Sequence, residues 1–169
     1  MKILFITHTD FEIPTYIVAW AKEKHFKISY CRPFKGEVLP QASEFDCLIL
    51  MGGTQYLLEL DRYPFLSDEI CFVEKAIIAG KIVLDFCLGA QIIGEAHGAK
   101  TEQSPNKEIG VFPIKLTADG QNDPLLIDLP ATFPVTHWHK YMPGIPQSAK
   151  ILATSEGCPR RWSRQCFFI

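Results

Sequence analysis

The segment of residues 81–100, KIVLDFCLGAQIIGEAHGAK, constrains the fold of this chain more than any other stretch. A short apolar run at its start predicts a strand, and the spacing of Ile92, Ile93 and Ala96 predicts a helix. The break between them leaves Cys87 in a sharp turn. A side chain there would project beyond the sheet edge and over a helix N-terminus, where the peptide dipoles favour a thiolate. Cys87 is therefore the cysteine that the sequence places for chemistry.

Short apolar strands alternate with helical segments in the rest of the chain. The patterns predict strands at residues 2–7, 27–31, 47–51, 110–116 and 133–139, and helices at 15–24 and 66–79. Such alternation favours an α/β fold: a three-layer, mostly parallel, doubly wound sheet of the flavodoxin-like kind, with helices on both faces. No repeat, low-complexity tract or linker interrupts the pattern, so we expect one domain over residues 1–169.

The composition indicates an ordinary globular protein, with 47% hydrophobic and 21% charged residues and a formal net charge of −2. This charge gives no reason to expect nucleic acid or an anionic membrane as a partner. No apolar run has the length of a membrane span or of a signal-peptide core. The six cysteines include no Cys-x-x-Cys pair, so neither a zinc site nor a disulfide scaffold is predicted. A reducing, cytoplasmic location is expected.

A thiol in a strand-to-helix turn is suited to acyl transfer, in which nearby backbone N–H groups stabilise the oxyanion. Leu88 would supply one N–H. Gly53 would supply the other, because a Gly-Gly pair at a strand end lets bare backbone approach a substrate. Gln91, one helical turn further on, would hydrogen-bond a polar substrate. The simpler interpretations are an ordinary turn at Gly52-Gly53 and a solvated helix residue at Gln91.

Other candidate residues also have simple interpretations. Cys31, Cys47 and Cys71 are interpreted as buried small hydrophobes. His137 and His139 lie two apart in a predicted strand, so they would share one face. Such a pair serves as a general base, as half of a metal site or as a satisfied structural pair. Because the sequence shows no third ligand, we favour the structural interpretation and predict no metal.

Several segments, taken in order and spacing, resemble one known family. They are Gly52-Gly53, CLGAQ at 87–91, KEIGVFP at 107–113, DPLL at 123–126 and FPVTHWH at 133–139, preceded by HTDFEIP at 8–14. Together they are similar to the class I glutamine amidotransferases, in particular to stand-alone members that resemble the glutaminase part of GMP synthase. The likeness extends over nearly the whole chain, up to about residue 159.

The resemblance implies that a cysteine attacks the side-chain amide of glutamine, releases ammonia and leaves a glutamyl thioester that water hydrolyses. By position, Cys87 would be the nucleophile, and the N–H groups of Gly53 and Leu88 would form the oxyanion hole. Gln91 would contact the substrate, and the backbone at Gly110 and Val111 would hold the amino-acid end of glutamine. No metal or organic cofactor is implied. A synthetase that accepts the ammonia is the implied partner.

Two departures from the family pattern bear on turnover. Asp85 stands where the family usually has Gly, and a carboxylate near the thiol would raise the pKa of that thiol. Family members also continue through a strand with a His-x-Glu pair, the general base and its carboxylate, whereas no histidine follows His139 here. The arginine-rich tail at residues 159–169 indicates a shifted reading frame, a truncated variant or a natural short form.

The chain is therefore expected to be an impaired glutaminase in which His137 or His139 acts as substitute base. One alternative is a non-catalytic binding or regulatory protein of the same fold. The other is a PfpI-type α/β hydrolase that also has a cysteine in the strand-to-helix turn. Loss of a final strand would expose a sheet edge, so a homodimer is expected.

Overall fold

The computed structural model describes residues 1–160 and 162–165, and their contacts divide into two compact units, Met1–His97 and Gly98–Ile169. The single domain expected over residues 1–169 stays a prediction. Residues 161 and 166–169, which include Cys166 and part of the expected divergent tail, lie outside the described residues.

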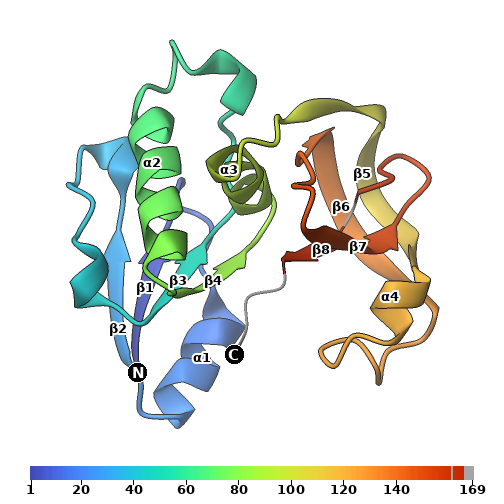
Figure 1. The fold of residues 1–169 in the computed structure, drawn as a ribbon, viewed down its shortest axis with the longest axis horizontal. Helices are drawn as coiled ribbons and strands as arrows, with labels where there is room; N and C mark the ends of the chain where they lie inside the picture. Colours follow the sequence, from blue (N-terminus) through green and yellow to red (C-terminus); the bar gives the residue numbers. More distant parts are fainter. Residues whose placement is uncertain (161, 166–169) are drawn as a thin grey trace. The chain divides into compact units, whose positions relative to one another are not determined.

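The first unit alternates strands and helices (Figure 1). Its elements are β1 (Lys2–Ile6), α1 (Thr15–Glu23), β2 (Lys27–Cys31), β3 (Cys47–Leu50), α2 (Phe65–Ile78), β4 (Ile82–Asp85) and α3 (Leu88–Ala96), with short 3-10 helices η1 (Pro33–Lys35), η2 (Ala42–Glu44) and η3 (Leu57–Glu59). Every strand and helix predicted for this part of the sequence is present, within a residue or two at each end.

Four parallel strands form the sheet of this unit, in the order β2-β1-β3-β4. Alternate residues of β1 pack on opposite faces, as the pleat requires. Leu4 and Ile6 belong to the apolar cluster with α2 and α3, whereas Ile3 and Phe5 belong to the cluster with α1. Helices therefore cover both faces, and the predicted three-layer α/β fold is confirmed.

The second unit is built on an antiparallel sheet of order β6-β5-β7-β8. Its elements are β5 (Glu102–Leu116), α4 (Ala118–Gln121), β6 (Thr132–Met142), β7 (Ala149–Thr154) and β8 (Trp162–Gln165). The two strands predicted here are present but longer than expected, and β7 and β8 were not predicted. The short helix α4 was not predicted either. The Thr117 hydroxyl caps it by accepting a hydrogen bond from the Gly120 N–H at 3.0 Å.

Burial of the cysteines agrees only partly with the sequence interpretation. Cys31 and Cys47 are buried, and this burial raises the pKa of each thiol to about 11, so both behave as inert core residues. Cys71 is exposed on α2, so its prediction as a buried residue is wrong. No helix in the described residues is long and apolar enough to cross a bilayer.

Candidate functional site

Cys87 occupies the turn between β4 and α3 in an unusual backbone conformation. Its φ is +55° and its ψ is −102°, a combination rare for a residue with a side chain. Gly89 permits α3 to begin this close to the sheet: a Cβ added there would lie 2.7 Å from both the Cβ and the carbonyl oxygen of Leu50 at the end of β3. The result is an exposed Cys87 at the N-terminal end of α3.

The Gly52-Gly53 pair follows β3 and lies beside the start of α3. A Cβ added to Gly53 would lie 2.7 Å from the Cβ of His8 and 2.9 Å from Cδ2 of Leu88, so neighbouring side chains enclose this glycine tightly. The structure thus brings the two predicted oxyanion donors, Gly53 and Leu88, into one neighbourhood. Within the described chain, the Gly53 N–H donates no backbone hydrogen bond.

Asp85 and Gln91 flank Cys87 along the chain. Asp85 ends β4, and burial raises the pKa of its carboxyl group to about 6. Gln91 is buried in α3, which excludes its interpretation as a solvated helix residue. Its Oε1 atom has no hydrogen-bond partner among the described residues. A buried amide oxygen without a partner is costly and can accept a hydrogen bond from a ligand.

A buried His8–Glu69 pair lies beside the glycine pair. His8 Nε2 is 2.9 Å from Glu69 Oε1, and His8 Nδ1 is 3.0 Å from the carbonyl oxygen of Gly52. Both neighbours are acceptors, so the protonated imidazolium satisfies both contacts. Burial alone would lower the pKa of His8, but the hydrogen bond and charge of Glu69, with the Gly52 carbonyl and the Glu12 charge, raise it above 6.5.

His8 is noted from the sequence only within the segment HTDFEIP at 8–14, and Glu69 is not identified from the sequence. A signal for Glu69 exists in the sequence of α2, because it falls three residues after Leu66 and three before Phe72, on the apolar face of that helix. A carboxylate on such a face has to find a buried partner. The sequence does not show which residue that partner is.

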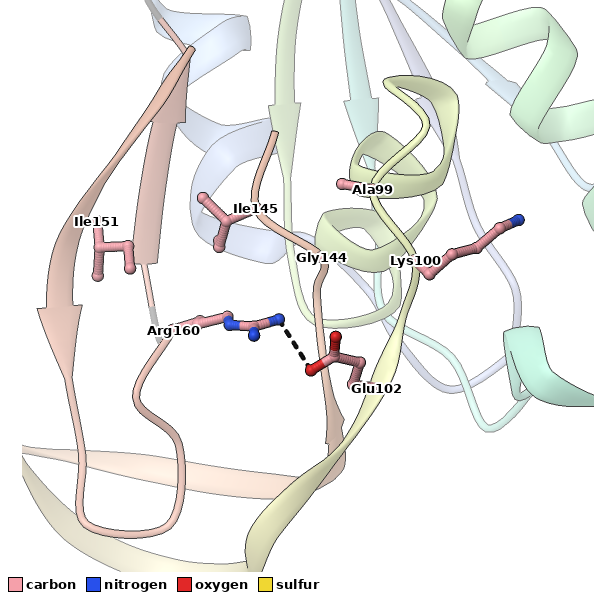
Figure 2. Close-up of a pocket in the computed structure, with 7 residues that line it drawn as sticks. All are labelled: Ala99, Lys100, Glu102, Gly144, Ile145, Ile151 and Arg160. Atoms are coloured by element: carbon pink, nitrogen blue, oxygen red, sulfur yellow. Dashed lines mark ion pairs between the residues drawn. The ribbon is translucent and has the colours of Figure 1, made fainter. Parts of the chain in front are cut away.

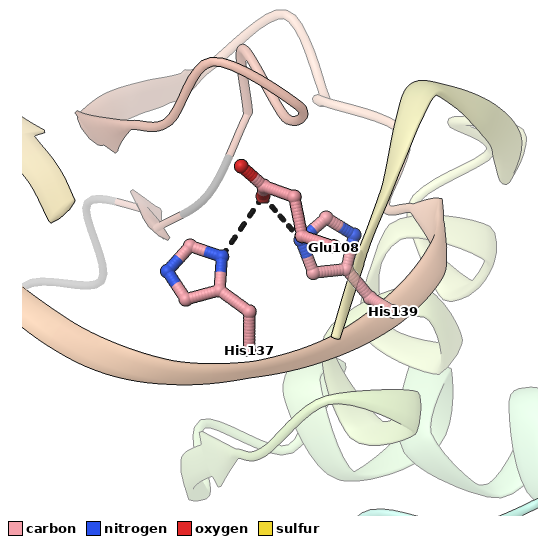
Figure 3. Close-up of side chains that lie close together, drawn as sticks. All are labelled: Glu108, His137 and His139. Carbon is pink, nitrogen blue, oxygen red and sulfur yellow. Dashed lines mark hydrogen bonds and ion pairs between the residues drawn. The ribbon is translucent and has the colours of Figure 1, made fainter. Parts of the chain in front are cut away.

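In the second unit, Glu108 is the centre of a buried polar network (Figure 3). Its Oε2 atom accepts hydrogen bonds from Nδ1 of His137 and Nε2 of His139, each at 2.8 Å, and from the hydroxyl of Ser155 at 2.7 Å. Its Oε1 atom accepts one from the Gly157 N–H at 2.9 Å. Burial alone would raise the pKa of Glu108, but these four hydrogen bonds lower it to about 2, so the group is an ionised carboxylate.

This network supplies the third residue that the sequence did not show beside the histidine pair. One ligand atom from each of Glu108, His137 and His139 lies within 4.8 Å of the others, so these three residues could hold a cation. The absence of a metal stays a prediction. The hydrogen bonds to Glu108, with the Ser104 hydroxyl 3.3 Å from Nδ1 of His139, provide partners for both nitrogens of His139 and for Nδ1 of His137. Nε2 of His137 is buried and has no hydrogen-bond partner among the described residues.

Gly110 and Val111 lie on β5, opposite His137 and Thr136 of β6. Gly110 has a φ of +134°, a conformation that favours glycine, and the side chain of Val111 is exposed. The candidate residues therefore form two groups. Cys87, Gly53, Leu88 and Gln91 belong to the first unit, and Gly110, Val111, His137 and His139 belong to the second.

A pocket of about 280 Å³ also lies in the second unit (Figure 2). Its lining includes Lys100, Glu102, Gly144 and Arg160, and Figure 2 shows the Arg160 guanidinium directed at Glu102, with an N–O distance of 3.1 Å. None of the predicted site residues lines it. Arg160 and Glu102 of this lining form an ion pair with each other.

Comparison with known proteins gives consistent matches. The model of the family "Glutamine amidotransferase class-I" matches residues 15–161. The glutamine amidotransferase-like protein YfeJ of Salmonella typhimurium is 41% identical over 165 residues, which cover 95% of this chain and 69% of that protein. The glutamine-hydrolysing GMP synthase of Petrotoga mobilis is 34% identical over 105 residues, which cover 62% of this chain and 19% of that enzyme.

A solved structure agrees. A glutamine amidotransferase from Thermotoga maritima matches with a TM-score of 0.88 and 26% identity, covering 97% of this chain and 71% of the other.

Proposed function

The chain belongs to the class I glutamine amidotransferase family, and we propose that it acts on the side-chain amide of glutamine through Cys87. The observation that carries this proposal is the exposed Cys87 at positive φ, at the start of α3 and preceding Leu88. This arrangement presents the sulfur to a substrate and places a helix N-terminus beside it, which favours a thiolate.

The chemistry follows from the groups around the thiol. The sulfur of Cys87 attacks the amide carbon of glutamine, and the N–H groups of Gly53 and Leu88 stabilise the negative charge that develops on oxygen. The carbon–nitrogen bond then breaks, and the nitrogen leaves as ammonia with the proton of the thiol. A glutamyl thioester on Cys87 remains, and water converts it to glutamate.

Substrate recognition would involve three further residues. The Oε1 atom of Gln91, buried and without a partner in the described chain, can accept an N–H of the substrate. The backbone at Gly110 and Val111 would hold the amino-acid end of glutamine, and the positive φ of Gly110 gives that strand an unusual backbone orientation. A buried polar atom that gains its partner only on binding favours substrates that supply this partner.

Hydrolysis of the thioester requires a general base, and His137 and His139 are the substitute candidates. Both are buried and donate hydrogen bonds to Glu108, which favours a structural role for the pair. The second candidate function follows from this observation: a glutamine-binding protein that forms the thioester but turns over slowly. A thiol without its base typically loses several powers of ten in rate.

We further propose that the ammonia passes to an acceptor held by a synthetase partner, as the name of the glutamine-hydrolysing GMP synthase relative supports. A cytoplasmic location is proposed because Cys31, Cys47 and Cys71 are free thiols, which is typical of a reducing compartment. Family membership argues against the PfpI-type hydrolase alternative.

Ammonia release from glutamine, compared between the unmodified chain and Cys87→Ala, tests the proposal. Cys71→Ala is the matched control, since Cys71 is also exposed. We expect release that Cys87→Ala abolishes and Cys71→Ala leaves intact. If the unmodified chain releases no more than about one ammonia per chain but a glutamine-like chloroketone labels Cys87, the slow-turnover function is supported. Failure of both assays would contradict both functions.

A further inference from the structure

An oxyanion hole is effective when its N–H donors point at the reacting oxygen before the reaction begins. The peptide between Gly52 and Gly53 presents a problem in this respect. Glycine has no side chain to restrict its backbone, so a Gly-Gly peptide can rotate between orientations that aim the Gly53 N–H in different directions. Some neighbouring group has to fix the orientation.

His8 makes the contact that can do so. Its Nδ1 atom lies 3.0 Å from the carbonyl oxygen of Gly52, and this oxygen belongs to the same peptide group as the N–H of Gly53. No peptide bond in the described chain is cis, and in a trans peptide the C=O and N–H point in opposite directions. A Gly52 carbonyl that faces His8 therefore directs the Gly53 N–H away from the imidazole ring.

Glu69 fixes the ring itself. Nε2 of His8 lies 2.9 Å and 3.1 Å from the two carboxylate oxygens of Glu69, and both side chains are fully buried. The Gln55 side chain donates a hydrogen bond to the backbone oxygen of His8 at 2.9 Å. On the other side, the Glu12 carboxylate packs against Gly52, where an added Cβ would lie 2.8 Å from each of its oxygens. These contacts hold the ring against the Gly52 carbonyl.

We propose that His8, held by Glu69, is a positioning residue that fixes the Gly52–Gly53 peptide and so presets the Gly53 N–H for the oxyanion. This rests on the proposed function, in which Gly53 donates to that oxyanion. If the His8–Glu69 pair were purely structural, it would only connect the loop after β1 to α2. Its loss would then have no specific effect on acyl transfer.

Two substitutions separate these roles, because each keeps one of the two hydrogen bonds. His8→Gln places an amide near the position of Nε2, so it keeps a donor to Glu69 and loses the donor to Gly52. His8→Asn places an amide near Nδ1, so it keeps the donor to Gly52. The second change is combined with Glu69→Gln, so that no buried carboxylate is left without a partner.

The measurement is the burst of p-nitroaniline from γ-glutamyl-p-nitroanilide, which reports formation of the thioester alone. We expect His8→Gln to slow the burst about 100-fold, the usual cost of losing one oxyanion donor. We expect the His8→Asn/Glu69→Gln protein to stay within about threefold of the unmodified chain, because its Gly53 N–H keeps its direction.

Alkylation of Cys87 by iodoacetamide is the internal control, because it displaces iodide at a saturated carbon and forms no oxyanion. We expect its rate to stay within about twofold in every variant. A His8→Gln protein with an unchanged burst, or one that loses burst and alkylation together, would overturn the inference.

A missing burst in the unmodified chain, with Cys87 still alkylated, would contradict the proposed function instead. The inference is then decided by NMR with carbonyl-¹³C, ¹⁵N-labelled glycine, because Gly52-Gly53 is the only Gly-Gly pair in the sequence and gives one doubly labelled peptide. Loss of the imidazole hydrogen bond should shift the Gly52 carbonyl resonance in His8→Gln but much less in the His8→Asn/Glu69→Gln protein. Equal spectra would overturn it.

Discussion

At the scale of single residues, titratable groups lie in the turn before Cys87 and beside the Gly52-Gly53 pair. Asp85 lies two residues before the thiol, and the buried His8 and Glu69 lie beside the glycine pair. Burial raises the pKa of Asp85, and Glu69, the Gly52 carbonyl and Glu12 raise the pKa of His8. The protonation of Asp85 and of His8 therefore affects the stability of the folded chain.

Asp85→Asn should stabilise the chain above pH 6. Burial raises the pKa of Asp85 from 3.8 to about 6, so the stability that the protonated group gives is lost as the pH rises through this interval. Asparagine does not ionise, and we expect a gain of about 1–3 kcal/mol at neutral pH that vanishes below about pH 4. Iodoacetamide should also alkylate Cys87 faster, since the carboxylate no longer opposes the thiolate.

Urea unfolding at both pH values and alkylation rates at neutral pH check this prediction. A gain of the same size at acid and neutral pH would mean that ionisation of Asp85 is not the cause.

The His8–Glu69 pair should make the folded chain less stable as the pH rises above 6.5. The pKa of His8 is raised above 6.5 in the folded chain, where Glu69, Glu12 and the Gly52 carbonyl face the ring. A raised histidine pKa gives stability that is fully present below 6.5 and is lost as the pH rises through the folded pKa.

We therefore expect the free energy of unfolding to fall as the pH rises above 6.5, and the fall to disappear in His8→Gln. Urea titrations across this range provide the measurement. A slope that persists in His8→Gln would assign the titration to another group.

The sequence predicts some of these residues and not others, for a physical reason. Cys87, Gly53 and Leu88 could be proposed because local patterns, a turn before a helix and a Gly-Gly pair at a strand end, mark them. Glu69 and Glu108 acquire their roles from partners 61 and 29 residues away in the sequence. No local pattern identifies such a partner, so only the structure reveals the His8–Glu69 pair and the Glu108 network.

At the scale of elements, the Glu108 network joins β5, β6 and the turn after β7. Glu108→Ala would leave four hydrogen-bonding groups, including His137 and His139, without their buried acceptor. We expect a loss of about 3–5 kcal/mol, as for breaking a buried charged network. Glu156→Ala is the matched control, because Glu156 is exposed two residues from the end of β7, and should cost under about 0.5 kcal/mol.

The pKa of Glu108 is lowered from 4.5 to about 2, so the stability of the folded chain depends on pH in the acid range. A depressed carboxyl pKa gives stability that is present above 4.5 and is lost as the pH falls through the folded value. Glu108→Ala should abolish this part of the acid sensitivity. Equal unfolding free energies for the two alanine variants would show that the network contributes nothing.

The elements themselves were predicted unequally. In the first unit each strand is a compact apolar run, such as CLIL in β3 with all four residues buried, because both sheet faces are covered. In the second unit β7 and β8 lie in stretches without a clear alternation. Antiparallel pairing, of β7 with β5 and of β8 with β7, rather than local pattern, defines them.

At the scale of the whole molecule, β4 is an edge strand whose apolar side chains are exposed to solvent. It is the last strand in its sheet, and Ile82 and Leu84 are 56% and 45% exposed. Exposed edges with apolar side chains promote self-association. We expect light scattering to show a dimer or larger assembly.

Leu84→Lys should shift this population toward monomer, whereas Val38→Lys, a change at a residue that is 90% exposed and outside the sheet, should not. A monodisperse monomer for the unmodified chain at assay concentrations would contradict the prediction.

The central claim is that Cys87 forms a glutamyl thioester, and mass spectrometry of the acid-quenched chain after incubation with glutamine tests it most directly. We predict a glutamyl adduct on the peptide that contains Cys87, removed by hydroxylamine and absent from Cys87→Ala. An intact, alkylatable Cys87 that never carries the adduct, or an adduct confined to Cys71 or another cysteine, would contradict the account.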